Sequence, residues 1–443
     1  MLAIFLAGTL AYFLVYPGNK SQIYQSFKLD NGLEVILVPN HTVPIVTQMI
    51  WYRYGSANEP HSKSGIAHFL EHMMFKGTDK FSSGAFSKKV AQKGGKDNAF
   101  TSRDFTAYHQ TISKENLEMV MEMEADRMRN LKFTQEQFDT EKKVILEERS
   151  SRVDEVPAAI LSEKMMKELF DGHPYGIPVI GKREEIEALE RDDAFNVYNQ
   201  AYSPNNAILI LAGDITRKEA EPLVKKYYGS IPSREVSIDK ISTNLPENNI
   251  QKRVAYADIK VKTPEQLIYF MAPNHHTRMS ELTYPTILLA HILGSGDTSI
   301  LYQNLVTDKK IAAFASADYD DFAIGPSVLI IHGIPSHGNK IEVLEKAILD
   351  EILKLTEQEI DSETIARAKN ELIASAIFAR DGVEPMANLF GRIVASNIDE
   401  DYLDKWDENI NKVTASDIKE AANFIFNNMP VVIGALEVKD NKQ

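Results

Sequence analysis

The two halves of this chain carry similar helix and strand patterns in the same order, and this repeat constrains the fold more than any other feature. In the first half the helix pattern GIAHFLEHMMFKG precedes the strand pattern NNAILILAGDI, and in the second TILLAHILGSGDTS precedes NNMPVVIGALEV. Asn205 follows His68 by 137 residues, and Asn427 follows His291 by 136 residues. This spacing predicts two related α+β domains, with chance similarity between unrelated domains as the alternative.

The predicted domain boundaries come from the length of the chain and from a local change in its composition. A chain of 443 residues is longer than one hydrophobic core usually supports. The segment PSREVSIDKISTNLPENNIQK is polar, rich in turn-forming residues and without periodicity, which is typical of a linker. We therefore expect a leader at residues 1–18, a first domain at residues 19–232, a linker at residues 233–252 and a second domain at residues 253–443.

The charge and the absence of cysteine exclude several classes of function. The formal net charge is -14 at pH 7, which argues against nucleic acid as a partner because phosphate binding requires a basic surplus. With no cysteine, the chain has no disulfide, no thiolate nucleophile and no cysteine-based zinc site. Any metal site must therefore use histidine and carboxylate side chains.

The first 16 residues, MLAIFLAGTLAYFLVY, contain no charged side chain and are followed by Pro17 and Gly18. This length fits the apolar region of a signal peptide or a minimal membrane anchor. The segment has neither a basic flank before it nor a small-residue cleavage site after it, so both interpretations stay open beside that of a buried helix. We expect the segment to target the chain out of the cytoplasm.

The helix pattern at residues 65–77 includes His68, Glu71 and His72 among apolar residues. On a helix with 100° per residue, His72 lies about 40° from His68 and Glu71 about 60° to the other side, so all three project from one face. Two imidazoles at this spacing can chelate one divalent ion, commonly zinc, and a carboxylate beside them can take a proton from water. The alternative is a pair of histidines that bind backbone or water on a half-exposed face.

A third ligand is expected from the helix pattern FDTEKKVILEERSSR. It places Glu141 and Glu148 two turns apart, on the apolar side marked by Val144 and Ile145, whereas Glu147 points elsewhere. A carboxylate directed into a core requires a cation or hydrogen-bond donors. Glu148 is therefore the candidate ligand, with a half-exposed helix charge beside basic neighbours as the alternative.

The motif HFLEH with the downstream sequence EKKVILEE resembles the pitrilysin-type zinc peptidases, the inverzincin family that includes insulysin and the mitochondrial processing peptidases. The resemblance covers nearly the whole chain after the leader. Within the family, the chain is most similar in kind to the short bacterial members with two domains. In that family the second glutamate of an E-x6-E pair, 75 intervening residues after the last motif histidine, binds zinc; here it is Glu148. Glu141 matches the supporting carboxylate and Glu71 the general base.

The resemblance implies one Zn²⁺ per chain, bound by His68, His72 and Glu148. It also implies two related domains in a mitochondrial-processing-peptidase-like metallohydrolase fold, each a mostly antiparallel sheet with helices packed on it. The first domain would be catalytic and the second an inactive relative. The implied function is that of a zinc metalloendopeptidase that hydrolyses peptides or unfolded protein segments. The leader adds the expectation of a periplasmic or membrane-anchored chain that faces outside the cytoplasm.

A substrate-binding strand is implied by GGKDNAFT, which is similar to the GG-x-x-N-A-x-T segment of the family. It would place Asn98, Ala99 and Phe100 on an edge strand that pairs with the peptide being cut. An exposed strand edge can hold an extended peptide by its backbone. From the residues alone, an internal hairpin strand is equally consistent with the pattern.

The chain departs from the family pattern at one place. Many members carry an arginine and a tyrosine, seven residues apart, in the second half, where they hold the peptide carbonyl; here those places are Val306 and Ala313. Neither side chain can donate a hydrogen bond, which a developing oxyanion requires. We therefore expect the catalytic subunit of a hetero-oligomer whose related partner supplies the arginine and tyrosine, with a self-sufficient chain as the alternative.

Two other functions stay open. The first alternative to a peptidase is a non-catalytic, membrane-tethered structural or adaptor subunit of a processing complex. The second is a hydrolase that acts on a small ester or amide. An intact metal motif argues against the first, and the GGKDNAFT strand favours a peptide over the second.

Overall fold

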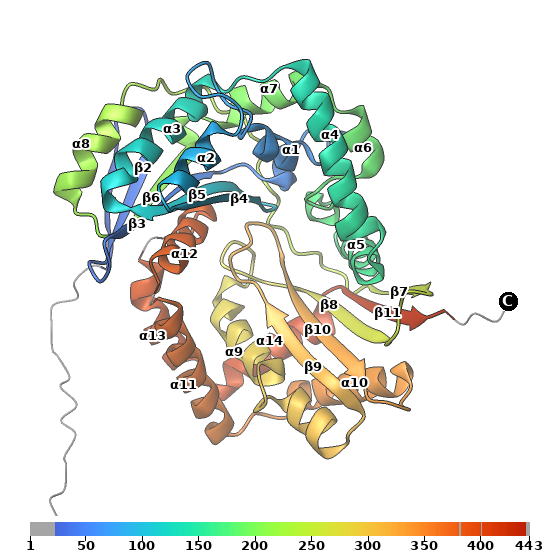
Figure 1. Cartoon of the computed structure of the whole chain (residues 1–443). Helices are drawn as coiled ribbons and strands as arrows, with labels where there is room; N and C mark the ends of the chain where they lie inside the picture. The colour runs from blue at the N-terminus through green and yellow to red at the C-terminus, as the bar shows by residue number, and fades with distance from the viewer. Residues whose placement is uncertain (1–22, 381, 400, 440–443) are drawn as a thin grey trace, which may run out of the picture.

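The computed structural model describes residues 23–380, 382–399 and 401–439, which form two domains, each with one β-sheet and the helices that cover it (Figure 1). The strand order is β1-β2-β6-β3-β5-β4 in the first sheet and β7-β11-β8-β10-β9 in the second. The pairs β2–β6 and β7–β11 are parallel, and the other neighbouring pairs are antiparallel. Both sheets are therefore mixed, and the predicted α+β fold with two sheet-plus-helix domains is confirmed.

The first domain contains all elements up to α8. Its strands are β1 (Gln25–Lys28), β2 (Glu34–Pro39), β3 (Ile45–Tyr52), β4 (Lys96–Thr101), β5 (Thr106–Ser113) and β6 (Ala207–Gly213). Its helices are α1 (Ile66–Met73), α2 (Ala85–Gln92), α3 (Leu117–Asn130), α4 (Gln135–Arg149), α5 (Pro157–Leu169), α6 (Arg183–Ala188), α7 (Arg191–Ala201) and α8 (Arg217–Tyr228).

The second domain follows a segment, residues 232–250, that contains no helix or strand. Its strands are β7 (Gln251–Asp258), β8 (Glu265–Ala272), β9 (Ala312–Tyr319), β10 (Ser327–Pro335) and β11 (Val431–Val438). Its helices are α9 (Thr283–Gly294), α10 (Ile341–Glu357), α11 (Ser362–Ala379), α12 (Val383–Ala395), α13 (Tyr402–Lys412) and α14 (Ala415–Asn428).

The two sheets correspond strand for strand once β1 is set aside. Strands β2, β6, β3, β5 and β4 occupy the places that β7, β11, β8, β10 and β9 occupy in the second sheet. Helix α1 lies between β3 and the edge strand β4 in the chain, as α9 lies between β8 and the edge strand β9. The repeat that was recognised in the sequence therefore extends to the topology of the sheets.

Each domain covers one face of the other domain's sheet with a helix (Figure 1). Helix α12 packs on the first sheet, where a Cβ at Gly391 would lie 2.0 Å from Trp51 Cε2. Helix α5 packs on the second sheet, where a Cβ at Gly434 would lie 2.1 Å from Met165 Sδ. Because both glycines lack a Cβ, helix α12 and helix α5 can approach the sheet of the other domain closely, and these contacts join the two domains.

No helix in the described part of the chain has the length and the apolar character that crossing a membrane requires. The expected leader at residues 1–18, with its signal peptide or anchor at residues 1–16, lies outside the described residues and stays a prediction.

Candidate metal centre

Two contacts hold the first turn of helix α1. Gly65 has a φ of 87°, in the left-handed region, and a Cβ there would lie 2.5 Å from the carbonyl oxygen of Ile180. The carboxylate of Glu59 accepts hydrogen bonds of 2.9 Å from the backbone N–H groups of Gly65 and Ala67. Burial raises the pKa of Glu59 well above its usual value, although the two backbone hydrogen bonds oppose this effect. These contacts fix the turn that presents His68.

Helix α4 lies beside α1 because the rings of Phe69 and Phe138 stack between them. The ring centroids are 4.4 Å apart, and both side chains are fully buried. Helix α4 begins at a capping box, in which Thr134 accepts from the Gln137 N–H and Gln137 accepts from the Thr134 N–H. Its last turn carries Glu148 to the side of α1 that bears the two histidines.

His68, His72 and Glu148 form a group that can hold one metal ion. Glu148 Oε2 lies 3.8 Å from His68 Nε2 and 3.4 Å from His72 Nε2, and one ligand atom from each residue lies within 4.8 Å of the others. Tetrahedral zinc with bonds of about 2.0–2.1 Å separates its ligand atoms by about 3.4 Å. Two nitrogens and one carboxylate oxygen are a common zinc ligand set with one open position. The donors present therefore fit zinc in both type and spacing.

The protonation of the two imidazoles is also compatible with metal binding. Burial, together with the positive charges of His72 and Arg152, lowers the pKa of His68 to about 3, so its ring is neutral. Burial also opposes the charged form of His72, but the hydrogen bond with Glu141 and nearby carboxylates outweigh it and raise the pKa of His72. Neutral imidazole is the form that binds zinc, and an ion at this place would displace the proton that these carboxylates favour.

Glu141 supports His72 from the outer side. Its Oε1 lies 2.8 Å from His72 Nδ1, and its Oε2 accepts a hydrogen bond from the Lys76 ammonium group. Burial raises the pKa of Glu141, but these two partners outweigh it and lower the pKa below its usual value. A carboxylate that accepts from Nδ1–H leaves Nε2 free to bind metal, which is the usual outer support of a zinc-binding histidine.

Glu71 lies on the same face of α1 but takes no part in the three-residue group. Its Oε2 accepts a hydrogen bond of 2.6 Å from Thr101 Oγ1, at the end of strand β4. The side chain is buried, and burial raises the pKa of Glu71 above its usual value despite the Thr101 hydrogen bond. A carboxylate with a raised pKa beside a metal-binding group is suited to accept and return a proton.

Three side chains of this site do not follow from the motif alone. Thr101 and Glu59 contact α1, and Arg152 Nη1 lies 2.7 Å from Glu148 Oε1. The spacing of four residues between Glu148 and Arg152 is a sequence signal for an ion pair on a helix. For Thr101, the signal is its position as the last residue of GGKDNAFT, whereas no local pattern connects Glu59 to the helix.

The second domain closes the place that corresponds to this site. With His291 matched to His68, Gly294 occupies the place of Glu71, and Ser295 that of His72. A Cβ at Gly294 would lie 1.9 Å from the backbone nitrogen of Ala317, so the edge strand β9 lies directly against helix α9. Position 294 therefore has no room for a side chain in the place that Glu71 occupies in the first domain.

The expected substrate strand is β4, at the edge of the first sheet. Among the described strands it pairs only with β5, so its other edge is free of strand pairing. Asn98 is exposed and accepts a hydrogen bond of 2.9 Å from the Ala99 N–H through its own Oδ1. Phe100 packs against Trp51, with ring centroids 5.3 Å apart. A peptide that paired with this N–H would have to displace the Asn98 side chain.

Val306 and Ala313 provide no hydrogen-bond donor from their side chains. Val306 lies in a π-helical turn, Tyr302–Asp308, and packs against the second core. Ala313 is exposed on β9. Neither side chain can therefore take the role that the resemblance gives to an arginine and a tyrosine at these places.

Comparisons with known proteins agree with this geometry. A family model described as "Insulinase (Peptidase family M16)" matches residues 34–183, and one described as "Peptidase M16 inactive domain" matches residues 188–372. The "Zinc protease PqqE" of Helicobacter pylori is 29% identical over 409 residues, which cover 91% of this chain and 90% of that protein. A "Probable mitochondrial-processing peptidase subunit beta, mitochondrial" of Arabidopsis thaliana is 25% identical over 420 residues, 92% of this chain and 77% of that one.

The crystal structure of a protease from Helicobacter pylori superimposes with a TM-score of 0.87 at 28% sequence identity, covering 94% of this chain and 99% of that one. A putative M16-like peptidase from Alicyclobacillus acidocaldarius has the same fold, with a TM-score of 0.82 at 20% identity, covering 94% of this chain and 98% of that one. The two family models together span most of the chain and both of its domains. The chain belongs to the peptidase M16, or insulinase, family of zinc proteases, as a short member with two domains.

Proposed function

We propose that this chain is a zinc metalloendopeptidase that cleaves peptides or unfolded protein segments. The observation that carries the proposal is the convergence of His68, His72 and Glu148 within 4.8 Å, with the Glu71 carboxylate on the same helix face. These three residues would hold one zinc ion. When bound, zinc lowers the pKa of a water molecule and polarises a carbonyl oxygen.

Glu71 acts as the general base in this proposal. It accepts a proton from the water that attacks the peptide carbonyl and returns it to the leaving amine. Thr101 holds one oxygen of Glu71 through its hydrogen bond, which leaves the other oxygen to exchange the proton. Glu141 keeps His72 in the tautomer with a free Nε2.

The substrate is an extended peptide that adds a strand to the free edge of β4. The segment Asn98, Ala99 and Phe100 would supply backbone hydrogen bonds through those of its N–H and C=O groups that point to the free edge, which give affinity without strict sequence selectivity. Two relatives, one named as a zinc protease and one as a subunit of mitochondrial-processing peptidase, support this class of substrate.

The domains have different roles in this proposal. Residues 19–232 form the catalytic domain, residues 233–252 the linker and residues 253–443 an inactive relative that covers the site. Because Val306 and Ala313 lack donors, a related partner chain supplies an arginine and a tyrosine to the peptide carbonyl. The leader at residues 1–18 directs the assembly to the periplasm or to the outer face of a membrane.

A non-catalytic structural subunit is the second candidate function, and the missing donors at Val306 and Ala313 favour it. Peptide cleavage and zinc content together distinguish the two candidates. The purified chain is incubated with a mixture of unfolded peptides, first alone and then together with any related chain that the neighbouring reading frame encodes. The zinc content of the purified chain is determined separately. We expect one zinc per chain, and cleavage only in the presence of the partner.

The Glu71→Gln variant tests the base directly. We expect it to keep its zinc and to lose cleavage by about 10²–10⁴-fold, the usual contribution of a general base. Glu147→Gln removes an exposed carboxylate next to Glu148 and serves as the matched control. Cleavage at the wild-type rate by Glu71→Gln would end the assignment of the base, and absence of zinc from the wild type would end the proposed function.

A further inference from the structure

A cavity of about 620 Å³ lies between the two domains, beside the end of strand β4. One wall comes from α5 and from segments of the first domain, and the other from β9, β10 and the loop that joins them. Arg103, on the first wall, follows Thr101 by two residues, so their Cα atoms lie within about 7 Å of each other. Thr101 contacts Glu71, so Arg103 lies two residues along the chain from the side chain that holds the proposed catalytic carboxylate.

Buried hydrogen bonds hold the two walls together. Tyr175 Oη donates to Asp104 Oδ1 at 2.5 Å and accepts from the Gly325 N–H at 2.8 Å. The other oxygen of Asp104 accepts from the Ile324 N–H at 3.1 Å. The loop between β9 and β10 is thereby tied to the first domain, so the shape of the cavity does not depend on loose surface side chains.

Arg103 has no carboxylate partner in the described part of the chain. Its Nε is buried without a hydrogen-bond partner, and its guanidinium carbon lies 5.5 Å from the centre of the Tyr175 ring. Burial lowers the pKa of the Arg103 guanidinium, although Tyr175 and two aspartates oppose this effect. A buried guanidinium N–H without an acceptor is costly, so this side chain still has the capacity to bind an anion directly.

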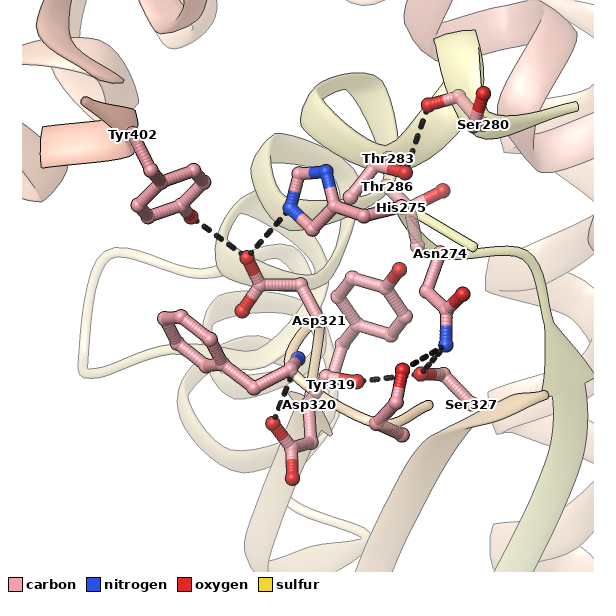
Figure 2. Close-up of polar contacts among 12 residues, drawn as sticks. Asn274, His275, Ser280, Thr283, Thr286, Tyr319, Asp320, Asp321, Ser327 and Tyr402 are labelled. Atoms are coloured by element: carbon pink, nitrogen blue, oxygen red, sulfur yellow. Dashed lines mark hydrogen bonds and ion pairs between the residues drawn. The ribbon is translucent and has the colours of Figure 1, made fainter. Parts of the chain in front are cut away.

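The aspartates of the cavity are engaged elsewhere or lie in water. Asp320 pairs with Arg392 at 2.8 Å. Asp321 accepts from Tyr402 Oη at 2.7 Å, and His275 Nε2 lies 3.2 Å from the same oxygen (Figure 2). Asp318 is exposed on β9, where solvent screens its charge. Arg103 is thus the cation of the cavity whose charge is least compensated.

We propose that Arg103 binds a carboxylate of the peptide substrate in this cavity and so sets a preference for an acidic group near the cleaved bond. The inference rests on the proposed function and names a substrate feature that the metal motif does not. A guanidinium binds a carboxylate through two parallel hydrogen bonds. A peptide on β4 advances about 3.3 Å per residue, so the group lies within about three residues of the cleaved bond. The carboxylate comes from an aspartate or glutamate side chain or from the chain end.

The test compares peptides that differ in one group. A glutamate is placed in turn at each of three positions on either side of the cleaved bond, and each peptide has a matched glutamine version. Every peptide is made with a free and with an amidated C-terminus, which separates a side-chain carboxylate from a terminal one. At one position we expect the wild type with its partner chain to prefer glutamate by about 10–100-fold in kcat/KM, as for a hydrogen bond to a charged group.

Substitutions of Arg103 should change the preference for glutamate and leave the zinc content and the thermal unfolding of the chain unchanged. Arg103→Met should abolish the preference, whereas Arg103→Lys keeps the charge and should retain part of it. Arg217→Gln, which changes an exposed arginine on α8, is the matched control and should retain all of it. Zinc content and thermal unfolding of each variant identify any loss of fold.

A binding measurement keeps the inference distinct from the proposed function. Fluorescence anisotropy with Glu71→Gln reports peptide binding without cleavage, and we expect the glutamate peptide to bind more tightly than the glutamine peptide. Cleavage without any preference for a carboxylate overturns the inference and leaves the proposed function standing. If no peptide is cleaved, the proposed function fails. Equal binding of the two peptides by Glu71→Gln, or binding of neither, overturns the inference.

Discussion

Replacing Glu141 with glutamine tests whether the outer carboxylate prepares His72 for zinc. The side chain keeps its size, but its charge disappears. A hydrogen bond to an ionised group contributes about 1.5–3 kcal/mol and one between neutral groups about 0.5–1.5 kcal/mol. The loss of about 1–1.5 kcal/mol at the 2.8 Å contact with His72 Nδ1 predicts zinc binding that is about tenfold weaker. Glu141→Ala also leaves the Lys76 ammonium without its partner, so we expect a loss of about 10–100-fold.

The assay is a zinc titration in competition with a chromogenic chelator, which reports affinity independently of cleavage. Glu147→Gln removes an exposed carboxylate from the same helix and is expected to bind zinc like the wild type. Circular dichroism of each variant checks that helix α4 is intact. Unchanged zinc affinity in Glu141→Gln would refute the argument that this carboxylate orients His72.

Three further predictions follow from other parts of the structure. Glu148→Gln should lose stoichiometric zinc while Glu147→Gln keeps it, measured by metal analysis after dialysis; equal zinc in both would exclude Glu148 as a ligand. Gly391→Ala should destabilise the fold by about 1–3 kcal/mol because its Cβ overlaps the fully buried Trp51, and an unchanged urea midpoint would contradict this. Burial raises the pKa of Asp104, so its charge opposes folding increasingly as the pH rises from about 3.9 through the raised value. The stability of Asp104→Asn relative to wild type should therefore increase over that range, and a flat difference would contradict the shift.

The part of the site that lies on single helices was predictable from spacing. Residues three and four apart share a helix face, which is why His68, Glu71 and His72 point the same way. The same rule distinguished Glu148 from Glu147, which is exposed. The apolar side of α4 was predicted only in part, because Ile145 is buried whereas Val144 is 47% exposed.

Contacts between distant segments were not predictable from any local pattern. Glu59 reaches the start of α1 from a preceding turn, and Thr101 reaches Glu71 from a strand 30 residues away. Helices α5 and α12 each cover the sheet of the other domain, which the linker pattern did not indicate. Such contacts depend on how sheets and helices pack, and packing is decided by the shapes of surfaces that no single segment contains.

The helices, the two-domain repeat and the ligand types could be predicted from the amino-acid sequence, because they follow from periodicity and from the chemistry of side chains. The tertiary packing of the two domains was needed to show that Glu148 lies 3.4 Å from His72, that strand β9 closes the second-domain counterpart of the site, and that Arg103 Nε is buried without a hydrogen-bond partner among the described residues. The physical reason is that distances between side chains of different elements depend on burial and packing across the whole fold, whereas spacing along one helix depends only on backbone geometry.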